Sequence, residues 1–134
     1  MFKNFLKKNK LEAIKRFQDK NDLLITYEQL ENIPLNKMIQ IVPDLPGAIE
    51  CTRISSNKKD SLMFTVTMKK NQLWEKHHHD CEETCVIYKG KLTDILTDYS
   101  VGSMQMLNYK PYTSHYIIAE EDSIFYVEFK KPNK

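Results

Sequence analysis

The sequence predicts one all-β domain that closes into a barrel or jelly roll and is preceded by an N-terminal α-helix. The chain has 134 residues, 41% of them hydrophobic, which is the size of a single domain with one core. After Asp22, short β-prone segments alternate with turn signals through the remainder of the chain. So many short strands in a small domain would leave unpaired edges unless the sheet closed on itself.

An amphipathic helix is predicted first, over residues 2–19, and Asn21 and Asp22 would end it. We therefore divide the chain into an N-terminal helix, residues 1–20, and a barrel domain, residues 21–134. The helix is expected to pack on the barrel or on a second subunit, although its lysines would also suit an anionic surface. Its apolar side chains fall within one half of a helical wheel: Phe2, Phe5, Leu6, Ala13, Ile14 and Phe17.

The β-rich part begins at residues 23–27, where apolar and β-branched side chains follow one another. Clusters of Pro, Gly, Asn, Asp and charged residues divide the rest into segments of strand length, notably at 43–47, 56–60, 89–90 and 120–122. The further strand candidates are residues 38–42, 49–55, 62–69, 84–88, 92–96, 103–107, 112–118 and 124–129.

The charge distribution gives no general reason to expect nucleic acid as a partner. Residues 1–20 contain seven Lys and Arg against two acidic residues, which leaves 13 basic and 16 acidic residues in the remainder. The barrel domain is therefore mildly acidic. In the whole chain, only Arg16 and Arg53 offer the planar donor fork that suits phosphate groups.

Cysteine count and hydropathy predict a soluble cytoplasmic protein. The three cysteines are an odd number, and Lys7, Lys8 and Lys10 interrupt any apolar run that could serve as a secretory signal. Reduced thiols are therefore expected. The apolar runs span only a few residues, far fewer than the about 20 that a membrane-crossing helix needs.

All four histidines lie at two places in the chain, at His77, His78 and His79 and again at His115. Neutral imidazole is the commonest metal ligand in proteins. His77 and His79 share one face if the backbone is extended, whereas on a helix they would point about 200° apart. The pattern therefore predicts a strand with His77 and His79 on its inner face and His78 on the outer face, where it is not a ligand.

Two more side chains would complete a metal site next to this strand. A short turn after His79 brings the carboxylate of Glu83 back toward the histidines, and it would add an oxygen donor. His115, on a strand that begins after Pro111, would reach the same point from across the barrel. The set of His77, His79, Glu83 and His115 is thus the predicted metal site.

The pattern His77-x-His79-x3-Glu83-x6-Gly90 resembles the first motif of the cupin superfamily in every spacing. Glu82 is an alternative acidic ligand, but the distance to Gly90 favours Glu83. Gly102, Pro111 and His115 resemble the second cupin motif, with a longer stretch from Gly102 to Pro111 than is usual. The resemblance covers roughly residues 37–131 and leaves the N-terminal helix outside.

This resemblance implies a cupin double-stranded β-helix with one divalent transition metal, which could be Fe, Mn, Ni, Zn or Cu. Four protein ligands would leave one or two coordination positions open to a small-molecule substrate. The expected function is a metalloenzyme of the dioxygenase, decarboxylase or isomerase type; the alternative is a non-catalytic cupin that serves as a sensor or regulatory module. A homodimer is expected. Trp74, Cys85 and Tyr112 are candidates for lining the pocket, with ordinary core packing as the other interpretation.

Overall fold

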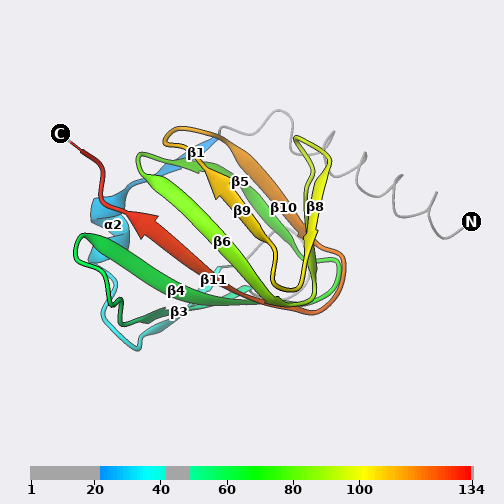
Figure 1. Cartoon of the computed structure of the whole chain (residues 1–134), viewed down its shortest axis with the longest axis horizontal. Coiled ribbons are helices and arrows are strands. Elements are labelled where there is room, and N and C mark those ends of the chain that lie inside the picture. The colour runs from blue at the N-terminus through cyan, green and yellow to red at the C-terminus, as the bar shows by residue number, and fades with distance from the viewer. Residues whose placement is uncertain (1–21, 42–48, 134) are drawn as a thin grey trace, which may run out of the picture.

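Two β-sheets face each other in the computed structural model, which describes residues 22–41 and 49–133 (Figure 1). Within these residues one sheet has five strands, in the spatial order β1 (Leu23–Ile25), β5 (Leu73–His79), β10 (His115–Ala119), β7 (Lys91–Asp94) and β8 (Tyr99–Gly102). The other sheet has six strands, in the order β2 (Met38–Ile41), β3 (Ile49–Ile54), β4 (Ser61–Met68), β11 (Ser123–Lys130), β6 (Glu82–Lys89) and β9 (Met106–Tyr109). The all-β prediction is confirmed.

Alternate side chains of each strand point inward and form the core between the two sheets. In β4 and β11 every second residue is buried, because successive side chains of a strand point to opposite faces. Each fully buried aliphatic or aromatic side chain stabilises the fold by about 1.5–3 kcal/mol. The core residues of these two strands are Leu62, Phe64, Val66, Met68, Phe125, Val127 and Phe129.

A short helix, α2 (Tyr27–Glu31), follows β1, where the sequence alone predicts a longer strand over residues 23–27. The strand ends at Ile25 because Thr26 caps the helix: its side chain accepts a hydrogen bond from the N–H of Gln29, and the Gln29 side chain accepts one from the N–H of Thr26. Arg53 of β3 donates hydrogen bonds from Nη1 to the carbonyls of Glu31 and Ile33. At its other end the segment is attached by the N–H of Tyr27, which donates to Oδ1 of Asp80 at 2.8 Å.

Two other predicted strands begin later than expected. The candidate at 103–107 is represented by β9 from Met106 onward, because Met104 has a φ of 67° and Gln105 accepts a hydrogen bond from the N–H of Gly102. The candidate at 112–118 begins at His115, because Tyr112 has a φ of 64° within a turn. A residue in this left-handed backbone conformation cannot be part of an extended strand, so each strand begins only after it.

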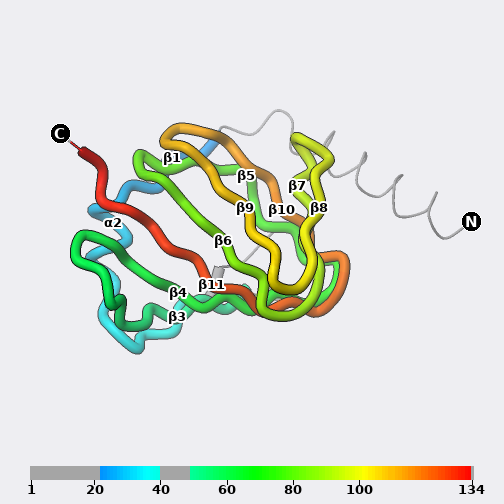
Figure 2. Tube along the Cα trace, in the orientation of Figure 1, coloured from blue at the N-terminus to red at the C-terminus, as the bar shows by residue number. Residues whose placement is uncertain are grey.

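The predicted turn at 89–90 requires glycine. Gly90 joins β6 to β7 with a φ of 106°, and a Cβ there would lie 2.2 Å from Oγ of Ser123 and 2.6 Å from the carbonyl oxygen of Asp122. This close approach lets the chain leave the six-stranded sheet after β6 and enter the five-stranded sheet beside β10. The trace of this turn can be followed in Figure 2.

The predicted N-terminal helix, residues 1–20, lies outside the described residues. None of the helices that the structure describes has the length and apolar character needed to cross a membrane.

Candidate metal centre

Strand β5 places two imidazoles on the inner face of the five-stranded sheet. His77 and His79 are buried, whereas His78 faces the other way and has Nδ1 3.1 Å from Oδ1 of Asp22. This is the alternation that an extended backbone imposes. The structure therefore separates His78 from the other two, as the spacing predicts.

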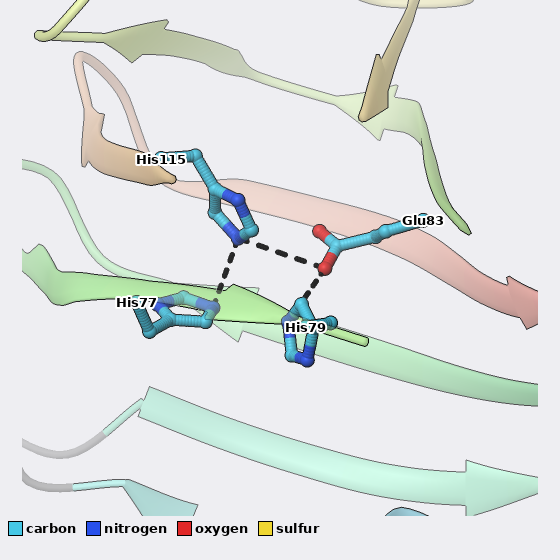
Figure 3. Close-up of side chains that lie close together, drawn as sticks. All are labelled: His77, His79, Glu83 and His115. Carbon is cyan, nitrogen blue, oxygen red and sulfur yellow. Dashed lines mark hydrogen bonds and ion pairs between the residues drawn. The ribbon is translucent and has the colours of Figure 1, made fainter. Parts of the chain in front are cut away.

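Glu83 and His115 reach the same point from two other strands (Figure 3). Glu83 lies on β6, directly after the turn that follows His79, and the residue is 5% exposed. His115 opens β10 and is the cross-strand partner of His77. One potential ligand atom from each of the four residues lies within 4.8 Å of the others, so that His77, His79, Glu83 and His115 could hold a metal ion.

Backbone carbonyls determine which nitrogen of each ring faces this centre. Nδ1 of His77 lies 2.7 Å from the carbonyl oxygen of Glu75, and Nδ1 of His79 lies 2.9 Å from that of Ile25. For His115 the distance to the carbonyl oxygen of Thr113 is 3.4 Å. A carbonyl can only accept, so Nδ1 carries the proton and the lone pair of each neutral ring is on Nε2.

The arrangement of these lone pairs fits a metal ion. Nε2 of His115 lies 2.9 Å from Nε2 of His77 and 3.6 Å from Oε2 of Glu83, and Nε2 of His79 lies 2.8 Å from the same oxygen (Figure 3). Nε2 of His79 is buried and has no hydrogen-bond partner among the described residues. Lone pairs that face one another repel unless a cation lies between them, and ligands around one transition metal are about 3 Å apart.

The protonation states of the cluster also suit a metal. Burial, together with the neighbouring His115, lowers the pKa of His77 to about 3. Burial alone would raise the pKa of Glu83, but the adjacent imidazoles of His115 and His79 favour the carboxylate form and hold this pKa below its usual range. At neutral pH His77 is therefore neutral and Glu83 ionised, as metal ligands must be.

Other buried side chains hold the four candidate ligands in place. The thiol of Cys85 donates a hydrogen bond of 3.1 Å to Oε1 of Glu83, which leaves Oε2 facing the histidines. The ring of Tyr109 stacks on His115 with 4.3 Å between centroids, and its hydroxyl donates to Oδ2 of Asp94 at 2.8 Å. Such contacts restrict the rotamers of the ligands and so preorganise the centre.

A cavity of about 250 Å³ lies between the two sheets and is lined by all four ligand residues. Trp74 and Cys85, two of the predicted pocket-lining residues, line it as well. Tyr112 does not: its side chain is 65% exposed, and only its N–H is near the centre, where it donates to the carbonyl of His79. The left-handed turn at Tyr112 directs the side chain outward, and no spacing in the sequence predicts that turn.

Sequence reasoning missed the contribution of the segment around α2. Gln29, Leu30 and Ile33 line the cavity, as does Cys51 of β3. The Thr26-x-x-Gln29 pattern is a capping-box signature and could have predicted the helix. Glu82, the alternative acidic ligand, instead pairs with Nζ of Lys110 at 2.7 Å on the surface.

The sequence matches no protein-family model and no curated protein. Solved structures resemble it in fold. KdgF from Halomonas sp. has a TM-score of 0.57 at 15% identity, over 69% of this chain and 86% of the other. An RmlC-like cupin from Shewanella frigidimarina has a TM-score of 0.57 at 12% identity, over 71% and 86% of the two chains. An acetylacetone dioxygenase from Acinetobacter johnsonii has a TM-score of 0.55 at 17% identity, over 66% of each chain. The fold is of the cupin type.

Proposed function

We propose that this cupin-type protein is a metal-dependent enzyme that transforms a small molecule at the centre formed by His77, His79, Glu83 and His115. The observation that carries the proposal is the cavity of about 250 Å³, which all four ligand residues line. A metal enclosed by protein on every side would have no place for a substrate, whereas this centre faces a space of substrate size.

The chain's own residues would hold the metal and shield the reaction. Three Nε2 atoms and Oε2 of Glu83 supply the ligands, and the thiol of Cys85 keeps Glu83 in place through its other oxygen. The apolar walls exclude bulk water, which strengthens electrostatic interactions inside the cavity. When bound, a divalent transition metal such as Fe, Mn, Ni, Zn or Cu would supply Lewis acidity and a template for the substrate.

Among the three reaction types expected from the sequence, dioxygenase, decarboxylase and isomerase, we favour the dioxygenase type. Two histidines and a carboxylate approximate the ligand set of non-haem iron oxygenases, here with a third histidine added. An acetylacetone dioxygenase is among the proteins of similar fold, at 17% identity.

We also propose that the protein is a homodimer in the cytoplasm and does not bind nucleic acid. The homodimer is supported by apolar side chains exposed on the outer face of the six-stranded sheet, namely Tyr88, Met106 and Tyr126. The mildly acidic composition after residue 20 supports the absence of nucleic acid.

Elemental analysis tests the metal site, with a neighbouring histidine as the matched control. The His79→Ala variant should lose at least 90% of the bound metal, on the order of the tenfold or larger effects seen when metal sites are altered. The His78→Ala variant should retain it, because His78 faces Asp22. Equal metal content in wild type and His79→Ala would contradict the ligand assignment.

The enzymatic part of the proposal requires turnover. The protein loaded with each metal in turn is incubated with small carbonyl and carboxylic compounds, and oxygen consumption and product masses are recorded. Oxygen uptake that requires both metal and compound supports a dioxygenase. Binding without turnover under any metal would instead support the alternative, a non-catalytic sensor or regulatory module.

A further inference from the structure

We infer that the substrate has an apolar body and a single polar end that binds the metal, with no second charged group. This inference rests on the proposed function. It is drawn from the walls of the cavity. Apart from the four candidate ligands, two of the described lining side chains contain oxygen or nitrogen, the amide of Gln29 and the ring N–H of Trp74, and both are neutral. Among the described residues, no Lys, Arg or Asp side chain lines this space.

The polar and apolar ends of the cavity follow from the strand register. Glu83 pairs with Phe129 of β11, and the next inward-facing pair is Cys85 and Val127. One step further along β11, Phe125 pairs with Val66 of β4. The atoms that could bind a metal therefore lie in one layer of the cavity. The inward-facing side chains of the next layers along β11 are apolar or thiol groups.

Trp74 connects these two ends. Its ring lies 5.5 Å from the ring of His77 and 6.5 Å from that of Phe125, measured between centroids. A substrate atom bound to the metal next to His77 would therefore continue along the face of Trp74 into apolar surroundings. A second charged group on the substrate would have no counter-charge there, because the indole N–H of Trp74 and the amide of Gln29 are neutral.

The charges in the cavity set a limit on the substrate. A divalent ion with the single carboxylate of Glu83 has one net positive charge, which one anionic oxygen of a substrate would neutralise. The Cys51 thiol in the cavity wall is neutral, because burial raises its pKa to about 12. A further anionic or cationic group would therefore be buried without a counter-charge, which is strongly unfavourable.

The volume of the cavity limits the size. An apolar protein cavity of about 150 Å³ accommodates benzene, so that 250 Å³ has room for roughly ten non-hydrogen atoms. Sugar phosphates, dicarboxylates and zwitterionic amino acids fail the charge criterion, and most cofactor-sized molecules fail the size criterion. Short-chain or aromatic compounds with one acidic oxygen satisfy both.

Titration of the full chain loaded with cobalt(II) tests the inference, because the visible spectrum of cobalt reports a new ligand. The probes are hexanoate, adipate, 6-aminohexanoate and acetate. Hexanoate should bind at least tenfold more tightly than adipate or 6-aminohexanoate, which add a charge at the far end. It should also bind at least tenfold more tightly than acetate, which lacks the apolar chain.

A wall variant separates the cavity from other binding sites. Val66→Phe should weaken hexanoate binding at least tenfold and leave acetate binding unchanged, whereas Thr65→Phe, on the outer face of the same strand, should change neither. If Val66→Phe does not fold, the probe series on the wild type still decides. If the protein takes up cobalt but binds hexanoate and adipate equally well, or binds no hexanoate, this inference is wrong and the proposed function is unaffected. Absence of cobalt uptake would overturn the proposed function and the inference with it.

Discussion

The backbone determines which ring nitrogen each imidazole of the candidate metal centre turns inward. Carbonyl oxygens of Glu75, Ile25 and Thr113 lie next to the three Nδ1 atoms. The side chains of these three residues can therefore change without altering the tautomers of the histidines. The carboxylate ligand differs, since Glu83 depends on the thiol of Cys85.

Cys85 is predicted to support metal affinity through this hydrogen bond. Cys85→Ala removes the donor to Oε1 of Glu83 and should lower the metal affinity about tenfold, the lower end of the effect expected for a residue that orients a ligand. Cys85→Ser restores a donor and should retain most of the affinity. Competition titration with a metal chelator measures both variants. Equal losses in the two would mean that Cys85 matters for packing and not for the hydrogen bond.

The stability of the metal-free protein is predicted to fall in acid. The pKa of His77 is about 3 in the folded chain and about 6.5 in an ordinary environment, so that between these values only the unfolded state binds the proton. The free energy of unfolding should therefore decrease as the pH is lowered from about 6.5 toward 3. Glu83 acts in the same direction, because its lowered pKa contributes stability that is lost when it is protonated.

Urea unfolding of the metal-free protein at a series of pH values measures this dependence. His77→Gln, which cannot titrate, should show a shallower decrease between pH 6.5 and 4 than the wild type. The same slope in both proteins would contradict the assignment to His77.

At the level of secondary-structure elements, the guanidinium of Arg53 fixes the C-terminal end of α2 over the cavity. Arg53 donates from Nη1 to the carbonyls of Glu31 and Ile33, at the end of the segment that contributes Leu30 and Ile33 to the cavity wall. A helix of this length does not persist without tertiary contacts. The mobility of α2 should therefore depend on Arg53.

Replacement of this arginine is predicted to loosen α2 without affecting the metal site. Arg53→Ala should lower the free energy of unfolding by about 1–2 kcal/mol, because it removes charge-assisted hydrogen bonds, and should speed amide exchange in residues 27–33. Arg53→Lys restores one donor and should have a smaller effect. Hydrogen-exchange mass spectrometry measures both variants. Unchanged exchange in Arg53→Ala would show that apolar packing alone holds the helix.

The ligand-bearing elements were largely predictable from the sequence because their signals are local. His77 and His79 lie on β5, and Glu83 follows His79 within four residues at the start of β6, in the opposite sheet, so that a short stretch of sequence carries all three. His115 is the partner of His77 across β10 and β5, a long-range pairing indicated by the resemblance to the second cupin motif and by the absence of any other histidine in the sequence. The structure brings these four side chains together in a cluster that could hold a metal ion.

Elements governed by unusual backbone conformations were not predictable in the same way. Met104 and Tyr112 have positive φ values, which are not typical of either residue type. The starts of two strands were therefore predicted too early in the chain, and Tyr112 was expected in the pocket. The α2 helix was missed because a run of apolar residues at 23–27 favours a strand, although the capping box of Thr26 and Gln29 indicates a helix start.

At the scale of the whole molecule, the homodimer remains a prediction that light scattering can test. The side chains of Tyr88, Met106 and Tyr126 are exposed on the outer face of β6, β9 and β11, where a second copy would cover them. The wild type should have twice the mass of the chain, and Tyr126→Glu should shift it toward the monomer. Tyr99→Glu, on the exposed strand β8 of the other sheet, is the control. A wild-type mass equal to one chain would contradict the prediction.

Strand β11 lies between β4 and β6, although every other described strand precedes it in the chain (Figure 2). During synthesis the ribosome adds about 5–20 residues per second. The edges of β4 and β6 that pair with β11 therefore lack a partner strand until residues 123–130 leave the exit tunnel. A chaperone that binds extended segments would find its target in this interval. The nascent chain could present metal ligands before its barrel can close, and a stop codon ahead of Ser123 would leave the two halves of the sheet without the strand that joins them.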